Sequence, residues 1–218
     1  MKVRALLIIL IVLLPGCLEE EEDTPEVEDA GVSNITLEIF HGESLEDATA
    51  TYTIKIMLNH TAAPIHADNM LKHVVAGSYD MTHFHRIIDN FMIQGGDFEN
   101  HDGTGGYAAD WYGYCNGQSA SQGDCAYTSW TIPDEADNGL LHIPCTISMA
   151  KTSAPDTGGS QFFIIPEDST PSHLNGVHTV FGEVTEGCEH ITTISEVATG
   201  DNDRPILPVV IYSATLDN

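Results

Sequence analysis

Apolar residues at two different spacings predict the secondary structure of most of the chain. At Ile35, Leu37 and Ile39, and again over 52–58, every second residue is apolar or aromatic, and the polar stretch HGESLEDA lies between the two runs. A period of two is typical of half-buried strands. The two runs therefore predict a β-hairpin.

Two later segments have apolar residues at helical spacing. The first lies between Pro64, which suits the first turn of a helix, and Gly77, which suits its C-terminal stop. The second covers about 188–198 and is closed by Gly200. Each segment is predicted to be a helix with one apolar face.

The remaining apolar runs are short, as expected of strands. The last strand is predicted over 206–216, where Pro208 requires an edge position or a start after the proline. The other strands are predicted near residues 83–88, 91–97, 145–150, 161–165 and 178–184. About eight strands and two helices indicate a mainly β fold, most simply a closed barrel.

Residues 1–16 have the composition of a secretory signal peptide. A basic start precedes an apolar run at 5–14, which is too short to span a bilayer comfortably. Cys17 follows a Leu-x-Gly sequence that resembles a lipoprotein box, which predicts cleavage before Cys17 and lipid on it. An uncleaved signal anchor is the alternative. Both predict an extracytoplasmic protein that contacts the cell membrane only through its N-terminus.

Residues 17–32 are predicted to form an acidic, disordered tether. Like charges repel, Pro25 and Gly31 break regular structure, and there is little apolar surface to bury. The folded part is then 33–218, a length that suits one domain with a full core.

Acidic residues dominate the charge of the chain. Seven Lys and Arg oppose 33 Asp and Glu, and removal of 1–16 takes away two of these cations and no acid, so the mature charge is −28. Phosphate binding needs clustered Lys and Arg, so nucleic acid is excluded as a partner. We interpret the excess acid as a solubilising surface, such as a salt-adapted protein has, in preference to an acidic binding face.

Four separate sequence blocks occur in the order found in one protein family. They are FHRIIDNFMIQGGDF (84–98), GTGG (103–106), ISMAKTSAPDTGGSQFFI (147–164) and HLNGVHTVFGEV (173–184). Together they closely resemble the cyclophilin family of peptidyl-prolyl cis/trans isomerases, over about residues 33–216. The resemblance implies a closed eight-stranded antiparallel barrel, capped by two α-helices, with a substrate groove on its outer face.

Isomerisation of an X–Pro bond makes and breaks no covalent bond, so it requires no nucleophile, metal or cofactor. The rotational barrier of the amide is about 18–20 kcal/mol, and uncatalysed exchange takes tens of seconds or longer. A catalyst must hold the proline ring and the flanking backbone, and it must favour the twisted amide, whose nitrogen regains a lone pair. The rigid, always charged donors of a guanidinium suit that task.

The resemblance assigns Arg86 as the catalytic arginine, which explains why a scarce cation lies in an apolar run. Gln94 is assigned to the substrate backbone, and Phe91 completes the catalytic group while forming a wall of a proline pocket. For Arg86, composition alone favours a surface ion pair. For the apolar wall residues the alternative is ordinary core.

The resemblance also implies a wider set of substrate-binding positions. The other pocket walls are Met92, Phe163 and Leu174. The main chain of Ala150 and Lys151 is expected to pair with the peptide. Further groove positions are Gly103, Gln161 and His178.

Two departures from the family pattern affect the groove. His173 occupies a substrate-binding position where many members have a tryptophan that hydrogen-bonds cyclosporin, so sensitivity to that drug is not implied for this chain. Lys151 and Thr152 replace a common asparagine and alanine, which is expected to change the preference for residues around the proline.

The segment 107–139 is longer than the family's usual connection. It contains both tryptophans of the chain, Trp111 and Trp130, and several tyrosines among Gly-rich polar residues. We interpret it as a loop insertion that packs its own aromatic side chains onto the barrel. The alternative is an aromatic rim that extends the substrate groove, which the family's GTGG block borders.

Four cysteines remain besides Cys17, an even number that suits two disulfides in an oxidising compartment. They allow three pairings. Cys115 and Cys125 bracket a flexible loop, so a bond between them would restrain the insertion. The strands next to Cys145 and Cys188 are neighbours in the family's barrel, so the resemblance implies these two as the second pair.

Other kinds of site find little support in the sequence. Eleven histidines include His83 and His85 on one strand, but no further ligand follows at the spacing of a known metal site, so no metal is expected. Asn34 and Asn59 fit the glycosylation sequon.

Two functions remain. The first is an isomerase that assists the folding of exported or surface proteins. The second is a cyclophilin-like module or chaperone that binds proline-containing segments with little turnover. Arg86, Phe91 and Gln94 together favour the enzyme. We expect a monomer that has proline-containing polypeptides as partners and uses no cofactor.

Overall fold

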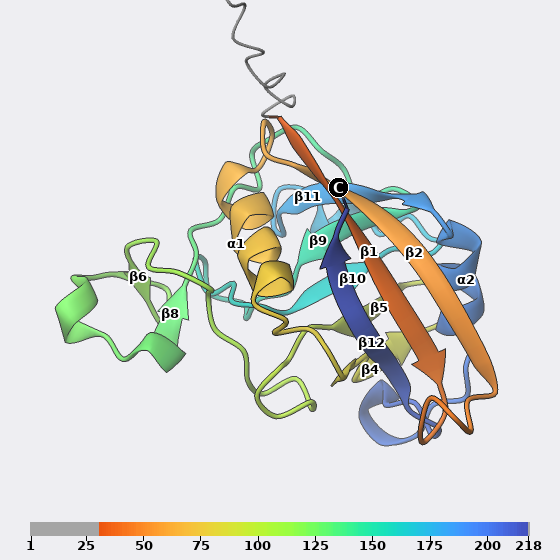
Figure 1. Ribbon diagram of the computed structural model, residues 1–218. Helices are drawn as coiled ribbons and strands as arrows, with labels where there is room; N and C mark the ends of the chain where they lie inside the picture. Colours follow the sequence, from red (N-terminus) through yellow and green to blue (C-terminus); the bar gives the residue numbers. More distant parts are fainter. Residues whose placement is uncertain (1–30, 218) are drawn as a thin grey trace, which may run out of the picture.

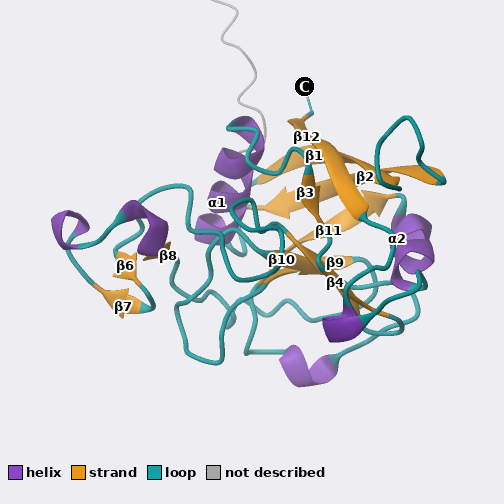
Figure 2. Ribbon diagram, turned by 90° about the horizontal axis from the view of Figure 1, so that it is seen from below, coloured by secondary structure: helices purple, strands orange, loops and turns teal. Residues whose placement is uncertain are grey.

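The computed structural model describes residues 31–217, which form a curled antiparallel sheet with a helix on either side (Figures 1 and 2). The strands are hydrogen-bonded in the order β3-β12-β1-β2-β11-β9-β10-β5-β4. Their bounds are β1 (Val32–His41), β2 (Ala50–Asn59), β3 (Thr82–His83), β4 (Arg86–Ile88), β5 (Met92–Gly95), β9 (Thr146–Met149), β10 (Phe162–Ile164), β11 (Val180–Glu186) and β12 (Val209–Leu216). The helices are α1 (Pro64–Val75) and α2 (Cys188–Ser195). The predicted mainly β fold with two helices is confirmed.

β1 and β2 form the hairpin that the period-2 pattern predicts. Ile35 faces Ile56 and Leu37 faces Ile54 across the pair, and all four side chains are fully buried. Their neighbours along each strand point the other way, because side chains alternate along a strand. Burial of each such side chain contributes about 1.5–3 kcal/mol of hydrophobic free energy, so the hairpin supplies one wall of the core.

α1 begins and ends at the residues that the sequence indicates. Pro64 occupies the first turn, and the next two backbone N–H groups, of Ile65 and His66, donate to the carboxylate of Glu135 at 3.0–3.1 Å. At the other end Gly77 takes a φ of 68° and donates its N–H back to the last turn. Both ends of the helix thus satisfy backbone groups that would otherwise lack partners.

The closed eight-stranded barrel needs a correction, because the ladder has nine strands and ends at β3 and β4. The single strand predicted at 83–88 is divided. Phe84 donates its N–H to the carbonyl of Val209 in β12, whereas Arg86 pairs with β5. Phe84 and His85 therefore connect β3, at one end of the ladder, to β4, at the other end. The two ends of the sheet are thus joined through the backbone of these residues and not by hydrogen bonds between β3 and β4.

Two other predicted boundaries move slightly. The α-helical part of α2 ends at Ser195, and the chain continues in a tighter turn in which Val197 donates to the carbonyl of Ile194. β12 begins directly after Pro208, because proline has no N–H to donate to a ladder. β12 lies inside the sheet between β3 and β1, so the edge position considered for it is wrong.

The insertion contains a second, small sheet instead of the predicted loop. Its strands, in the order β7-β6-β8, are β6 (Tyr114–Cys115), β7 (Gln118–Ser119) and β8 (Trp130–Thr131). We call residues 114–131 the lobe; it projects from the barrel on the side of α1, at the left of Figures 1 and 2. Strands of two residues have no recognisable period-2 pattern, which is why the sequence predicts only a loop.

Both predicted disulfides are present. Cys115–Cys125 lies within the lobe, and Cys145–Cys188 joins the residue before β9 to the first residue of α2. Within residues 31–217, the one group of three side chains placed for a metal ion consists of Cys145, Cys188 and Glu167. Because the two sulfurs are bonded to each other, they are not available as thiolate ligands.

The predicted signal peptide, the lipid site at Cys17 and residues 17–30 of the tether lie outside the described residues. The tether is predicted to reach residue 32, but Val32 already pairs with Asn59 as the first residue of β1. Among the helices of the described part, none is long and apolar enough to cross a membrane.

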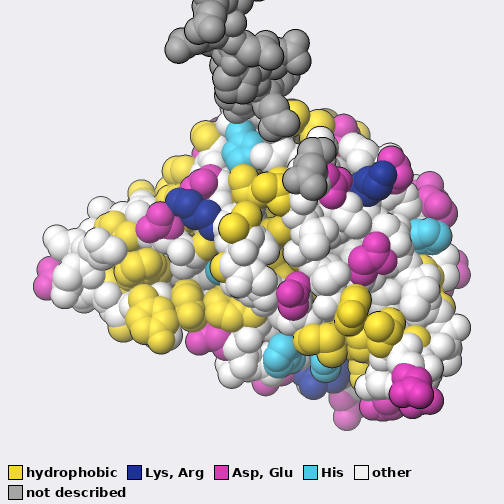
Figure 3. All heavy atoms as spheres, viewed as in Figure 1, with side chains coloured by type: hydrophobic (Ala, Val, Ile, Leu, Met, Phe, Trp, Pro, Cys, Tyr) yellow, Lys and Arg dark blue, Asp and Glu magenta, His cyan; other side chains and the backbone are white. Residues whose placement is uncertain are grey.

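The cations of the described part are dispersed among many acidic side chains (Figure 3). Four of the five Lys and Arg of residues 31–217 form ion pairs, namely Lys55 with Glu186, Lys72 with Asp68 and Asp110, Arg86 with Asp203, and Lys151 with Asp134. Each of these positive charges is therefore partly neutralised where it lies.

Candidate active site

The strand register places three of the predicted site residues in one row on the outer face of the sheet. Arg86 of β4 faces Gln94 of β5, and Gln94 faces Phe163 of β10. Side chains of directly paired residues point to the same side of a sheet, whereas Ile93 points to the other side and is fully buried in the core. The alternation of the strands thus allows a cation and an amide to lie within otherwise apolar sequence.

These three side chains border a pocket of about 340 Å³, which we call the apolar pocket. It is lined by Arg86, Phe91, Met92, Gln94, Ala150, Lys151, Phe163, Leu174 and His178. All of these are predicted site residues, and they come from segments far apart in the sequence. Of the other predicted positions, His173 lies against Phe91, and Gly103 and Gln161 line an adjoining chamber.

The floor of the apolar pocket is a small hydrophobic cluster outside the barrel core. Met92, Phe163 and Ile165 are each exposed by 5 % or less, and Phe91 and Leu174 pack against them. The floor residues are as buried as the core interpretation expects. They form a cluster of their own, however, which opens on the groove and offers packing to an apolar ring.

Two histidines hold the ring of Phe163. His142 stacks on it with centroids 5.7 Å apart, and His178 meets it edge to face at 5.6 Å. Burial lowers the pKa of both histidines, since a charged imidazole would lose its hydration there. A hydrogen bond of His142 with Asn175, and one of His178 with the carbonyl of Met149, oppose this effect only in part. Both histidines beside Phe163 are therefore uncharged at pH 7.

Phe91 forms the outer rim of the apolar pocket and stacks on His173, with centroids 5.9 Å apart. His173 is exposed and belongs to the 3-10 helix η3 (Ser172–Leu174). The groove thus keeps an aromatic surface at the position where the family often has tryptophan, but that surface is the smaller imidazole.

Arg86 forms the ion pair that its alternative interpretation expects, and it borders the pocket as well. Its Nε donates to Oδ2 of Asp203 at 3.3 Å, and its side chain is 40 % exposed. Asp203 lies in the turn η4 (Asp201–Asp203), where Asn202 and Asp203 both adopt a positive φ. With Nε engaged, the terminal Nη groups remain as donors for a ligand. Sequence reasoning missed Asp203, because it lies in a polar turn that carries no motif.

Hydrogen bonds between side chains fix Gln94. Its Nε2 donates to Oε1 of Gln161 at 2.9 Å. The Nε2 of Gln161 donates in turn to the carbonyls of Gly103 and Gly105 at 2.9 and 2.8 Å. Because the amide nitrogen of Gln94 is engaged in this way, its Oε1 is the atom suited to accept a hydrogen bond from a bound backbone N–H.

A buried carboxylate shapes the loop that presents these carbonyls. Asp97 is fully buried and accepts hydrogen bonds from five backbone N–H groups between residues 99 and 105, at 2.9–3.2 Å. Desolvation raises the pKa of Asp97, but the N–H donors outweigh it and leave the pKa lowered. Asp97 is therefore ionised and holds the loop, including Gly103, against Gln161. Asp97 is the acid of the GGD sequence in the first family block, but no local pattern indicates this role.

Ala150 and Lys151 lie at the groove, and some of their polar groups already bond to other residues of the protein. The N–H of Ala150 donates to the carbonyl of Gln161 at 3.0 Å, so a bound peptide would pair with its carbonyl. The side chain of Lys151 is only 5 % exposed, and its Nζ lies 3.3 Å from a carboxylate oxygen of Asp134. Lys151 is thus placed to act on a peptide through its backbone, while its side chain anchors the insertion.

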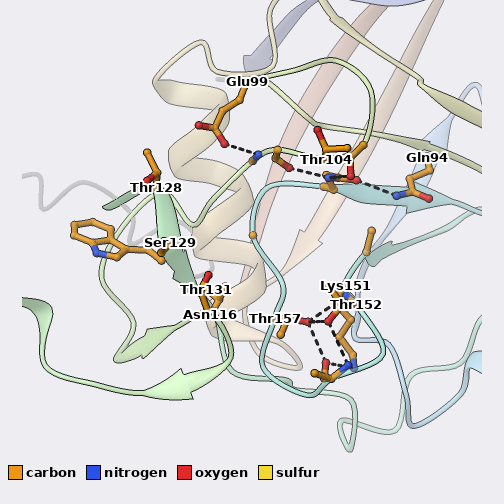
Figure 4. A pocket seen from close by; sticks show the side chains of 18 residues that line it. Gln94, Glu99, Thr104, Asn116, Thr128, Ser129, Thr131, Lys151, Thr152 and Thr157 are labelled. Carbon is orange, nitrogen blue, oxygen red and sulfur yellow. Dashed lines mark hydrogen bonds between the residues drawn. The ribbon is translucent and has the colours of Figure 1, made fainter. Parts of the chain in front are cut away.

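The adjoining chamber has a volume of about 590 Å³ (Figure 4). Gln94, Ala150 and Lys151 line both spaces, so the apolar pocket and the chamber form one groove. Residues 103–106 line the barrel side of the chamber, and residues of the lobe line the other side. That the insertion extends the groove is the alternative considered from the sequence, and residues 116 and 128–131 line it here.

Fold and site together define a class of protein. A curled antiparallel sheet carries on its outer face an apolar pocket, with a guanidinium at the edge and polar groups placed for a peptide backbone. Proline combines an apolar ring with a backbone that has no N–H, and it fits such a groove. The class is that of a protein that binds polypeptides at proline.

Comparisons with known proteins identify the family within this class. Residues 46–216 match the family described as cyclophilin type peptidyl-prolyl cis-trans isomerase/CLD. The chain is 37% identical over 183 residues to peptidyl-prolyl cis-trans isomerase cyp18 of Streptomyces antibioticus, covering 79% of this chain and 98% of that protein. It is 34% identical over 175 residues to peptidyl-prolyl cis-trans isomerase A of Dickeya dadantii, covering 77% and 81%.

A solved structure agrees with these relatives. The crystal structure of a cyclophilin type peptidyl-prolyl cis-trans isomerase from Cryptosporidium parvum superposes with a TM-score of 0.67 at 25% identity, covering 86% of this chain and 98% of that one. The chain belongs to the cyclophilin type peptidyl-prolyl cis-trans isomerase family, as its four sequence blocks predict.

Proposed function

We propose that this protein catalyses cis/trans isomerisation of X–Pro bonds in polypeptides outside the cytoplasmic membrane, and so assists the folding of exported or surface proteins. Its family supports the reaction. The observation that carries the proposal for this chain is the position of Arg86, whose guanidinium borders the apolar pocket. The two disulfides support the location, because such bonds persist in oxidising compartments.

In this mechanism the groove first binds the ground state of the peptide. The proline ring packs on Phe163 and Met92, while Oε1 of Gln94 and the carbonyl of Ala150 accept backbone hydrogen bonds. These contacts hold the two sides of the X–Pro bond separately, so that one side can rotate relative to the other.

Arg86 acts on the twisted state. When the amide is planar, the lone pair of the prolyl nitrogen is delocalised and accepts no hydrogen bond; when the amide twists, the lone pair becomes an acceptor. A guanidinium N–H fixed beside the ring then stabilises the transition state more than the ground state, which is the condition for catalysis. Asp203 holds Nε and so limits the directions in which the Nη donors point.

A protease-coupled isomerisation assay on short Ala-Pro peptides tests the proposal. We expect exchange far above the uncatalysed rate, with kcat/KM of about 10⁴ M⁻¹s⁻¹ or more. Binding of the same peptides without acceleration would instead support the alternative function, a module or chaperone that holds proline-containing segments.

We further propose that the enzyme works as a monomer on an acidic tether attached through lipid on Cys17. The predicted site residues come together within a single chain, so the groove needs no second copy to be complete. The Leu-x-Gly-Cys sequence supports the anchor. Sedimentation of the purified domain tests the monomer, and mass spectrometry of the membrane-extracted protein tests the lipid on Cys17.

A further inference from the structure

The lobe is part of the groove, although it belongs to a segment outside the barrel. Asn116 and residues 128–131 line the chamber from the lobe side. In Figure 4 the labelled lobe residues Asn116, Thr128 and Ser129 lie on one side of the open space, and Gln94 lies on the other. A polypeptide bound at the apolar pocket would therefore meet the lobe as it continues through the chamber.

The lobe is fixed to the barrel at several points, so its wall has a defined position. Trp130 and Tyr112 pack against the main core, and Ile132, directly after the lobe, forms a β-bridge with Gly158. Further along the insertion, the ion pair of Asp134 with Lys151 is largely buried.

A second set of contacts fixes the other end of the insertion to α1. Lys72 donates to Asp110 at 2.8 Å, and the hydroxyl of Tyr112 donates to Asp68 at 2.7 Å. The lobe is thus held on both sides of the Cys115–Cys125 disulfide. A wall anchored in this way can discriminate between side chains, because it does not simply move aside.

The chamber is lined mainly by uncharged polar groups. Hydroxyl side chains are contributed by the lobe and the barrel, at Thr104, Thr128, Ser129, Thr131, Thr152 and Thr157. Trp130 is the one large apolar side chain among the lining residues of this chamber. The exposed Tyr127 meets Tyr107 edge to face instead of lining the chamber. The wall is therefore mainly polar, and of the aromatic residues considered as a rim from the sequence Trp130 lines the chamber.

The two ionisable side chains of the lining already have partners. The ammonium of Lys151 is paired with Asp134, and the carboxylate of Glu99 accepts the N–H of Gly106 at 2.8 Å. A charged substrate side chain would lose hydration in the chamber without a new counter-charge. A large apolar side chain would cover hydroxyl and backbone groups and leave them without water, which is unfavourable for each group left without a partner.

We propose that the lobe is a specificity element that binds the polypeptide on one side of the proline and favours an uncharged polar side chain there over a large apolar one. This inference rests on the proposed function, because it concerns the substrate of the same groove. An amide such as that of glutamine both donates and accepts, so it matches the mixed donors and acceptors of the hydroxyl wall.

The test compares two kinds of substrate with the intact domain. The first is a short Ala-Pro peptide, which measures the apolar pocket alone. The second is a set of longer peptides in which Gln or Leu is placed in turn at each of the three positions on either side of the proline. We expect one position at which Gln raises kcat/KM by about five- to tenfold over Leu, and near equality at the other positions.

Two lobe variants and a matched control assign the preference. Thr128→Val keeps the shape of the wall but removes a hydroxyl, and it should shift the preference towards Leu. Ser129→Trp fills the chamber and should lower the ratio of long-peptide to short-peptide kcat/KM. Ser119→Trp adds the same side chain to an exposed lobe strand away from the chamber, and it should leave that ratio unchanged.

The outcomes separate the two proposals. If the wild-type domain does not accelerate even the short peptide, the proposed function fails. If it accelerates the short peptide but shows no preference for Gln at any position, or if Ser129→Trp and Ser119→Trp behave alike, the lobe is not a specificity element. A variant that still turns over the short peptide has folded, so a lower long-peptide rate in that variant is due to the change in the lobe and not to misfolding.

Discussion

At the scale of single residues, Arg86 is the group whose loss should separate turnover from binding. Arg86→Ala should lower kcat by about a hundred- to a thousandfold, since loss of one transition-state donor costs about 2.7–4 kcal/mol. KM should change little, because the apolar floor remains. Arg86→Lys should restore little activity, since an ammonium lacks the fixed geometry of a guanidinium. Separate measurement of kcat and KM checks this.

Phe91→Ala is the control for that experiment. It opens the rim of the apolar pocket, so it should raise KM as well as lower the rate. Near-wild-type turnover by Arg86→Ala, with an unchanged melting profile, would show that Arg86 has no catalytic role and serves only in the ion pair with Asp203.

Asp203 is expected to position Arg86 without touching the substrate. The pair is partly exposed, and such pairs are worth about 0.2–1 kcal/mol. Asp203→Ala should therefore lower kcat by roughly two- to fivefold with KM unchanged. Asp203→Asn keeps an acceptor oxygen and should retain most of the rate. Equal losses in the two variants would show that the acceptor does not orient the guanidinium.

The sequence predicted the lining of the apolar pocket well but not the residues that support it. Arg86, Gln94 and Phe163 share a face because of strand register, and local spacing together with the family's blocks conveys that. The contacts of Asp203 with Arg86 and of His142 with Phe163 join distant segments. Nothing in the local pattern of either segment specifies such a contact.

At the scale of elements, α1 carries a buried histidine that should make the fold sensitive to acid. Burial lowers the pKa of His73 to about 4, and its hydrogen bond to the carbonyl of Tyr107 opposes this only in part. An unfolded histidine has a pKa of about 6.5. As the pH falls from 6.5 to 4, this histidine is protonated in the unfolded chain but stays largely neutral in the native state. The free energy of unfolding therefore decreases, by about 3 kcal/mol at pH 4 relative to its value above pH 6.5.

His73→Gln tests this contribution. Glutamine keeps a hydrogen-bond donor but does not titrate, so the free energy of unfolding should fall less steeply between pH 6.5 and 5 than in the wild type. Urea unfolding at several pH values measures both slopes. Parallel slopes would mean that His73 is not the group responsible, and that other buried histidines such as His85 dominate.

The lobe should loosen without its disulfide while the barrel stays folded. The Cys115→Ser/Cys125→Ser variant should lose about 2–3 kcal/mol of local restraint, and it should be cleaved by proteases within 116–126 far faster than the wild type. Its main thermal transition should change little. Cys145→Ser/Cys188→Ser, which frees α2 from β9, is the comparison and should lower the main transition itself. A barrel transition lowered equally in both variants would contradict a separable lobe.

Elements with a long apolar pattern and clear end signals could be predicted from the sequence, as the hairpin of β1 and β2 and the helix from Pro64 show. The lobe could not. Its strands of two residues are held by a disulfide and by contacts to α1 such as Lys72 with Asp110, and these depend on the fold as a whole.

At the scale of the whole molecule, the proposed membrane location of the enzyme rests on lipid attachment at Cys17. We expect mass spectrometry of protein extracted from membranes to find an N-terminal lipopeptide that begins at Cys17. Cys17→Ser should release the domain into the soluble fraction with unchanged isomerase activity. A soluble wild-type product that begins at another residue would contradict the lipid anchor.

The way the barrel closes also affects how readily the main sheet can aggregate with unfolded polypeptides. β3 and β4, the ends of the main ladder, are only two and three residues long, and Phe84 and His85 join them. A long unpaired edge is a template on which foreign strands assemble into aggregates. Within residues 31–217 the main sheet has no such edge. An unfolded chain that exposes a strand would therefore find no long row of free backbone groups on this sheet with which to pair.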